Sequence, residues 1–170
     1  TNTLLGEVPE IKNFFVCCGL NSIGIGSGGG VGKVTAEWLM TGHINQDIFC
    51  YDIKRFQKFH SELGFIKKRI TESLGDLYGM HWPYKQHKTS RNVKTLPHHD
   101  NLKSFGACFG VSGGYERPMW FALDGEKSEY KYSYNYQNWF PSAEYESNNT
   151  IKNVGLFDLT PFSKFEIKSD

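Results

Sequence analysis

Six glycines fall within the nine residues from Gly24 to Gly32, shortly after the continuous apolar run Phe14–Cys18. A short apolar run rich in strand-forming residues is typical of a strand that is buried on both faces. Apolar residues then recur at helical spacing up to Gly42, where a helix end favours a left-handed residue. The pattern predicts a buried strand, a glycine loop and an amphipathic helix, with the functional end at the carboxyl edge of the strand.

A phosphate-binding P-loop is the first interpretation of the glycine run, because Ser27–Lys33 ends in Gly-Lys. The residue five positions before Gly32 is Ser27, where the motif needs glycine, and Val34 has no hydroxyl group for magnesium. The sequence therefore argues against a nucleoside triphosphatase.

A dinucleotide-binding Rossmann opening is the second interpretation, because Gly24, Gly26 and Gly29 fit the GxGxxG spacing. Asp52 ends a possible second strand, Ile48–Tyr51, where a ribose hydroxyl would be held. After Asp52, however, strands and helices stop alternating, so such a sheet would have too few strands.

The rest of the chain predicts an α+β fold with no internal repeat. We expect a helix from Ser61 to Gly79, an extended connection over 80–97, a short helix at Asp100–Phe105, a strand at Ala107–Val111, a loop-rich segment over 112–141, a helix capped by Ser142, and strands at Leu156–Leu159 and Lys164–Lys168.

Composition excludes several classes of function. The 170 residues are 39% hydrophobic, with 19 Lys and Arg against 18 Asp and Glu. A formal charge of +1 argues against a nucleic-acid partner, and no apolar stretch is long enough for a membrane span. Cys17, Cys18, Cys50 and Cys108 have no metal-ligand spacing, so we expect buried, reduced thiols and no metal site.

Several blocks, in chain order, resemble one family. They are Gly6–Ile11, Gly19–Ile25, Gly28–Lys33, Ala36–Trp38, Tyr51–Phe56, Gly114–Pro118, Trp120–Phe121 and Asp158–Ile167. Together they resemble the dimethylglycine and sarcosine dehydrogenases, which are FAD-dependent oxidoreductases. Arg55-Phe56 and the Phe162–Ile167 ending also resemble the regulatory subunit of pyruvate dehydrogenase phosphatase, which shares this architecture.

The resemblance implies that the chain is a middle fragment of a longer polypeptide. Residues 1–44 would be the final strand, loop and helix of the FAD-binding α/β domain, and 45–122 a small central domain. Residues 123–170 would be a linker and the first strands of an aminomethyltransferase-like, folate-binding domain. The turn that holds the FAD pyrophosphate would lie upstream, so we expect these residues alone to be inactive.

The resemblance assigns the flavin-facing segment, and no catalytic or metal-binding residue, to this chain. Its members are Asn21, Ser22, Gly24, Ile25, Gly28, Gly29, Gly30, Val31, Gly32 and Lys33. Glycines let the backbone approach a planar ring, and the amides at a helix start carry positive partial charge. A helix start aimed at N1 and O2 of a flavin would stabilise the negative charge that develops there on reduction.

The function implied by the resemblance is oxidation of an N-methyl amine such as dimethylglycine or sarcosine, with one-carbon transfer to tetrahydrofolate. The partners would be the amine and an electron acceptor, and tetrahydrofolate would bind downstream of this chain. The implied location is the mitochondrial matrix in a eukaryote and the cytoplasm in a bacterium. The alternative is a non-catalytic regulatory subunit of the pyruvate dehydrogenase phosphatase type.

Three other features have structural interpretations. His98 and His99 with Asp100 could suggest metal ligands, but adjacent histidines on a helix point in different directions, so they suit a helix start after Pro97 better than a metal site. Glu116 and Arg117 suit a buried clamp at a domain seam. The aromatic segment 130–140 has no run of basic residues and suits packing between domains.

Overall fold

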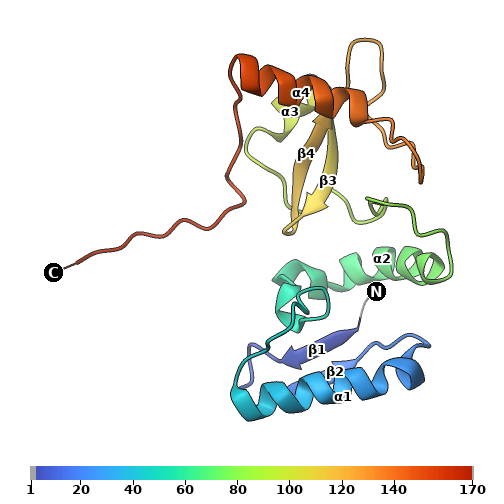
Figure 1. Cartoon of the computed structure of the whole chain (residues 1–170), viewed down its shortest axis with the longest axis vertical. Helices are drawn as coiled ribbons and strands as arrows, with labels where there is room; N and C mark the ends of the chain where they lie inside the picture. Colours follow the sequence, from blue (N-terminus) through green and yellow to red (C-terminus); the bar gives the residue numbers. More distant parts are fainter. Residues whose placement is uncertain (1–2, 170) are drawn as a thin grey trace. The chain divides into compact units, whose positions relative to one another are not determined.

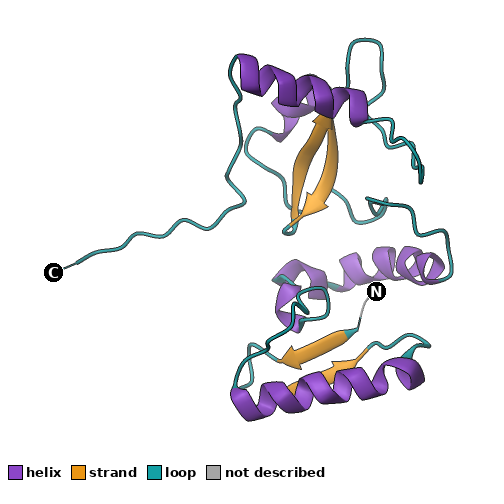
Figure 2. Ribbon diagram, in the orientation of Figure 1, coloured by secondary structure: helices purple, strands orange, loops and turns teal. Residues whose placement is uncertain are grey.

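The computed structural model describes residues 3–169, which form short helices and strands joined by long connections (Figures 1 and 2). In chain order these are β1 (Leu4–Glu7), β2 (Phe15–Cys18), α1 (Gly24–Thr41), the 3₁₀ helices η1 (Ile53–Arg55) and η2 (Lys58–Ser61), α2 (Leu63–Leu77), α3 (His99–Ser104), β3 (Ala107–Ser112), β4 (Tyr115–Phe121) and α4 (Phe140–Lys152). The expected α+β fold is confirmed. The chain divides into two units, Thr1–Tyr78 and Gly79–Asp170.

The first unit is built on the antiparallel pair β1 and β2, with Leu5 opposite Cys17. Trp38 of α1 packs edge-on against Phe15 of β2, with ring centroids 5.5 Å apart, and is buried. The amide of Leu5 also donates to the carbonyl of Tyr51, 2.9 Å away, which ties the segment before η1 to β1. These contacts bury Leu5 and Trp38 as the apolar centre of the unit.

The second unit is built on the antiparallel hairpin of β3 and β4, and α4 lies next to β4 (Figure 1). The amide of Phe121 donates to the Glu146 carboxylate of α4 at 2.8 Å. The buried apolar residues of this unit are Leu96, Ala107, Cys108 and Trp120. They share the interior with three buried polar residues, Glu116, Gln137 and Ser142.

The glycine run is helical, so the expectation of a loop there was wrong. Positive φ angles at Gly19, Asn21 and Ser22 complete the change of chain direction before residue 24. The helical hydrogen bonds then begin at once, with the Ser27 amide donating to the Ile23 carbonyl at 2.9 Å. The far end of α1 is as predicted, because Gly42 has φ 75° and its amide donates to the Trp38 carbonyl.

The first predicted strand, Phe14–Cys18, pairs with a segment that was not expected to be a strand. Residues 4–7 form β1, whereas Ile48–Tyr51, which the Rossmann interpretation needs as a strand, forms turns in which the amide of Tyr51 donates to the carbonyl of Ile48. The segment of the possible Rossmann strand meets β1 at an isolated parallel bridge from Leu5 to Asp52. An antiparallel hairpin does not provide the parallel strand–helix–strand unit that a Rossmann opening needs.

Three expectations for the second unit need correction. Strand β4 lies in a segment that was expected to be loop. A strand can form there because Pro118 lies opposite Phe109 at an irregularity of the ladder, where a missing amide is tolerated. Helix α4 begins at Phe140, with Pro141 in its first turn, so Ser142 lies inside the helix and is fully buried. Residues 153–169 form neither helix nor strand (Figure 2). Leu156 and Ile167 there are at least 94% exposed, so the expected strands lack a partner among the described residues.

Other elements agree with the sequence within a few residues. Helix α2, helix α3 and strand β3 lie where the apolar spacing predicted them. The aromatic segment packs inside the second unit, where Tyr130 contacts Trp120 and Tyr134 contacts Trp82. None of the described helices combines the length and apolar character that crossing a bilayer requires.

Candidate functional site

The ten residues of the proposed flavin-facing segment lie on one continuous stretch of the first unit. Asn21 and Ser22 form the turn before α1, and the other eight lie in the first three turns of that helix. The structure therefore brings together all of the residues that the resemblance selected, on a helix start in place of a loop.

The turn before α1 fixes where the helix begins. Asn21 and Ser22 have φ angles of 42° and 73°, in a region that non-glycine residues rarely adopt. The hydroxyl of Tyr78 donates to the hydroxyl of Ser22 at 2.9 Å, and the amide of Ile23 donates to the carbonyl of Leu20 at 3.0 Å. The direction of the helix start is thus set by contacts inside the first unit.

The amides of Gly24, Ile25 and Gly26 precede the first helical hydrogen bond, which is donated by Ser27. Such amides have no acceptor within their own helix and carry the positive end of the helix dipole. The first turn contains no acidic side chain to neutralise this positive end. The start of α1 is therefore suited to a negatively charged or hydrogen-bond-accepting group.

The glycines of α1 leave open space beside the helix. A Cβ atom placed on Gly26, Gly28, Gly29, Gly30 or Gly32 would meet no atom within 4 Å, apart from neighbouring residues and the helix backbone. By contrast, a Cβ on Gly6 would lie 2.6 Å from Trp38. Packing among the described residues explains Gly6, whereas the α1 glycines leave room for a group that approaches the helix backbone.

The lysine of the segment points to solvent. Lys33 lies 3.8 Å from the carboxylate of Glu37 one turn further along α1, and its side chain is 74% exposed. An exposed pair of this kind contributes little to stability and is screened by salt. The helix amides, more than Lys33, carry the positive potential of this segment.

A buried ion pair in the second unit was only half predicted. Glu116 is buried as expected, but its partner is Arg91, whose Nε and Nη2 atoms lie 2.7 and 2.5 Å from the carboxylate. Burial raises the pKa of Glu116, but the bonds from Arg91 and the Asn92 amide outweigh this effect and hold the pKa below its usual value. Arg117 instead lies over the ring of Phe162. Nothing in the sequence pairs residues 91 and 116, because the fold alone brings them together.

The cysteines offer no nucleophile in the second unit. Burial raises the pKa of the Cys108 thiol to about 11, so it stays protonated and unreactive at neutral pH. Cys17, Cys18 and Cys50 are free, as predicted, but exposed, contrary to the expectation of burial. Cys17 and Cys18 end β2, which belongs to a sheet of two strands, so both strands are edge strands.

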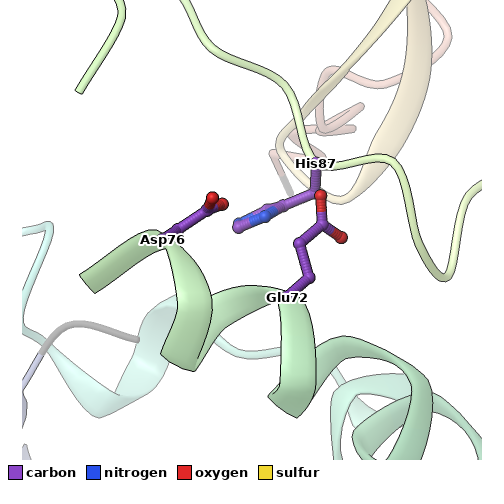
Figure 3. A group of neighbouring side chains, drawn as sticks. All are labelled: Glu72, Asp76 and His87. Carbon is purple, nitrogen blue, oxygen red and sulfur yellow. The ribbon is translucent and has the colours of Figure 1, made fainter. Parts of the chain in front are cut away.

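Two groups of histidines and carboxylates could suggest a metal site. The first lies at a helix start, and the members of the second come from different units. His98 stands at the residue before α3, which begins at His99, so the pair lies at a helix start as the structural interpretation predicted; the His98 side chain makes no capping hydrogen bond. Glu72 and Asp76 lie one turn apart on α2 (Figure 3). The third labelled side chain, His87, belongs to the second unit.

His60 is a half-buried histidine of the first unit. Its ring stacks on Phe59, with centroids 4.0 Å apart, and its Nδ1 atom lies 3.0 Å from the amide of Gln57. Burial, and then the nearby Arg69 and Arg55, lower the pKa of His60. The folded state disfavours protonation of His60. The contribution of His60 to the free energy of unfolding is therefore fully present above the ordinary pKa of histidine, about 6.5, and is lost as the pH falls below that value.

We therefore expect the melting temperature of the first unit to decrease as the pH is lowered from 6.5 to 5, and we expect this decrease to be smaller in the His60→Gln variant. Circular dichroism melts of the parent chain and of the variant at several pH values test this. An equal acid dependence in the two chains would contradict it.

Comparison with known proteins adds two family matches. A family model described as FAD dependent oxidoreductase central domain matches residues 41–95. A second, described as GCVT N-terminal domain, matches residues 98–169. Residues 1–40, which include the glycine run, lie outside both matches.

Individual relatives match between about two thirds and almost the whole of the chain. It is 42% identical, over 98% of its length, to 4-methylaminobutanoate oxidase (formaldehyde-forming) from Paenarthrobacter nicotinovorans, and covers 20% of that protein. It is 37% identical, over 69% of its length, to mouse mitochondrial sarcosine dehydrogenase, of which it covers 13%. It is 33% identical, over 98% of its length, to the mouse pyruvate dehydrogenase phosphatase regulatory subunit, of which it covers 19%. The chain thus spans a fifth or less of the length of these relatives.

Proposed function

Because the chain belongs to the sarcosine and dimethylglycine dehydrogenase family of FAD-dependent oxidoreductases, we propose that it is part of a longer flavin-dependent enzyme. That enzyme oxidises a small N-methyl amine. Relatives named for oxidation of sarcosine, dimethylglycine and 4-methylaminobutanoate support this substrate class. Mitochondrial relatives support the matrix as the location in a eukaryote, with the cytoplasm as the location in a bacterium.

The proposed domain organisation has three parts. Residues 1–44 complete an FAD-binding domain, 45–122 form a central domain, and 123–170 lead into an aminomethyltransferase-like domain. The family matches at 41–95 and 98–169 support the order of a central domain followed by an aminomethyltransferase-like domain, although the second match begins before the proposed boundary at 122. Tetrahydrofolate would then bind in the region downstream of this chain.

The glycine-rich start of α1 carries the proposal that this chain contributes to the flavin site. Five helical glycines have no neighbouring atom where a side chain would stand, and the amides of Gly24, Ile25 and Gly26 precede the first helical bond. These residues fit a flat, electron-rich group that lies against the helix start. Bound FAD supplies two-electron oxidation of the amine. The residues of this chain would position the ring and stabilise negative charge on its edge through the amides.

Replacement of Gly30 by leucine in the complete polypeptide tests this role. We expect Gly30→Leu to lower flavin affinity and amine turnover at least tenfold, because the leucine side chain would occupy the open space that the ring needs. Leucine has a better helix propensity than glycine by about 0.8 kcal/mol, so the apoprotein should be as stable as the parent or more so. Flavin content from the visible spectrum, turnover with dimethylglycine and the melting temperature are the three measurements.

Gly64→Leu is the matched control, because Gly64 is also a helical glycine with open space around its Cβ position. It should keep flavin and turnover. A Gly30→Leu polypeptide with normal flavin content and turnover would contradict the proposed role of α1.

A regulatory subunit is the second candidate function. The observation that favours it is the match to the pyruvate dehydrogenase phosphatase regulatory subunit over 98% of this chain. A complete polypeptide that oxidises neither sarcosine nor dimethylglycine, and that binds pyruvate dehydrogenase phosphatase, would establish this alternative over the enzyme.

A further inference from the structure

The second unit contains a cavity of about 650 Å³ that the flavin proposal does not use. It is lined by the connection 86–92, by α3 and β3, and by the segment 128–132. Its volume lies within the range of 300–1,000 Å³ that is usual for small-molecule sites. All of its lining residues belong to the second unit.

One part of the lining is aromatic. Tyr130 and Tyr132 are stacked with ring centroids 5.6 Å apart and an angle of 7° between their planes. Phe109, also in the lining, lies against the ring of His99 with centroids 4.1 Å apart. Flat aromatic surfaces of this kind favour a ligand that contains a ring.

Arg91 makes one wall rigid without providing a free charge. Its Nη1 atom donates to the His87 carbonyl and its Nη2 atom to the Phe109 carbonyl, each at 3.0 Å. The carboxylate of Glu116 neutralises its charge. Ser90 and Asn92 on either side have φ angles of 48° and 59°, so the backbone that flanks Arg91 adopts conformations that other contacts must maintain.

The remaining charge of the lining favours an anion. Lys103, in the last turn of α3, lines this cavity and also an adjoining cavity of about 810 Å³. Lys88 lies in the wall of the first cavity, and Glu129 supplies its one carboxylate among the described lining residues. Because Arg91 and Glu116 cancel, the balance of formal charge around the cavity is positive.

We propose that this cavity binds a small aromatic carboxylate. The ring lies against the tyrosine side of the cavity, and the carboxylate is held by the ammonium group of Lys103 through a charge-assisted hydrogen bond. This proposal does not depend on the flavin role of α1, since every residue that it uses lies in the second unit.

Titration of the whole chain with sodium benzoate, followed by amide NMR shifts, tests the proposal. We expect saturable shifts at the amides of Lys103, Phe109 and Tyr132, and about a fivefold weaker Kd for Lys103→Gln, as expected for loss of one partly exposed charge contact. The matched control is Lys152→Gln, which removes a lysine from the last turn of α4 instead of α3. It should leave the Kd unchanged.

Two further probes separate the ring from the charge. Benzyl alcohol keeps the ring without the carboxylate, and inorganic phosphate keeps an anion without the ring, so each should bind at least fivefold more weakly than benzoate. Equal binding of phosphate and benzoate would overturn the aromatic assignment. Absent shifts with benzoate, or an unchanged Kd in Lys103→Gln, would overturn the site itself.

Discussion

Replacement of Arg91 by methionine is expected to lower the free energy of unfolding of the second unit by about 3–5 kcal/mol, because it leaves the buried Glu116 carboxylate without its cation. Glu116 is only 2% exposed and lies on β4, and Arg91 also holds the carbonyls of His87 and Phe109. Urea denaturation at pH 7, followed by tryptophan fluorescence, measures the loss, because Trp120 is buried in the same unit.

The pH dependence distinguishes loss of charge pairing from loss of packing. In the parent chain the pKa of Glu116 is lowered, so its stabilising effect is present above the ordinary pKa of glutamate and is lost as pH falls through the folded pKa. Without Arg91, burial raises the pKa of Glu116, and protonation at lower pH then removes the unpaired buried charge of the variant. The stability difference should therefore shrink from pH 7 to pH 4; a constant difference would contradict the electrostatic explanation.

Two variants serve as controls for Arg91→Met. Lys33→Met breaks an exposed pair with Glu37 and should change stability by less than about 0.5 kcal/mol. The double variant Arg91→Met with Glu116→Leu should recover part of the loss, because no buried charge then lacks a partner. No recovery would mean that Arg91 acts through packing and its carbonyl contacts alone.

Gly6→Ala is expected to destabilise the first unit by about 3 kcal/mol, from an unfavourable backbone angle and overpacking against Trp38. Gly6 has φ 122°, which side-chain-bearing residues rarely adopt, and a Cβ there would lie 2.6 Å from Cη2 of Trp38. Because Trp38 is part of the apolar centre of the unit, it has little room to move. The melting temperature of the first unit, measured by circular dichroism, should fall accordingly.

Gly42→Ala separates the two causes. Gly42 also has a positive φ angle, 75°, but a Cβ atom there would meet nothing within 4 Å. We expect it to cost about 1 kcal/mol, from the left-handed conformation alone. If the two variants destabilised the unit equally, the contact between Gly6 and Trp38 would not matter.

Elements set by local spacing were predictable. Helix α2 carries apolar residues three and four positions apart, and it lies at Leu63–Leu77 within the predicted range. Gly42 ends α1 in the left-handed conformation that its position indicated. Each of these features depends on residues within a few turns of one another, so the pattern that specifies it is visible in the chain.

The glycine segment shows where local reasoning failed. Glycine favours loops because a helix restricts it more than other residues, by about 1 kcal/mol per residue. In the structure the turn is completed upstream at Gly19–Ser22, and the helix that Trp38 anchors extends back through the glycines. The ten proposed site residues were selected by resemblance, and their role in flavin binding remains a prediction.

The amino-acid sequence by itself determined the α+β class, the positions of α2, α3 and β3, and the resemblance to flavin-dependent amine dehydrogenases. Short-range periodicity and ordered motifs carry that information, because they need no knowledge of distant contacts. Only the tertiary structure decided that β1 is the partner of β2, that Pro118 sits within β4, and that Arg91 neutralises Glu116. Those outcomes depend on residues 8–25 positions apart meeting in space. A buried carboxylate selects its cation by distance and desolvation, and neither quantity is encoded in local spacing.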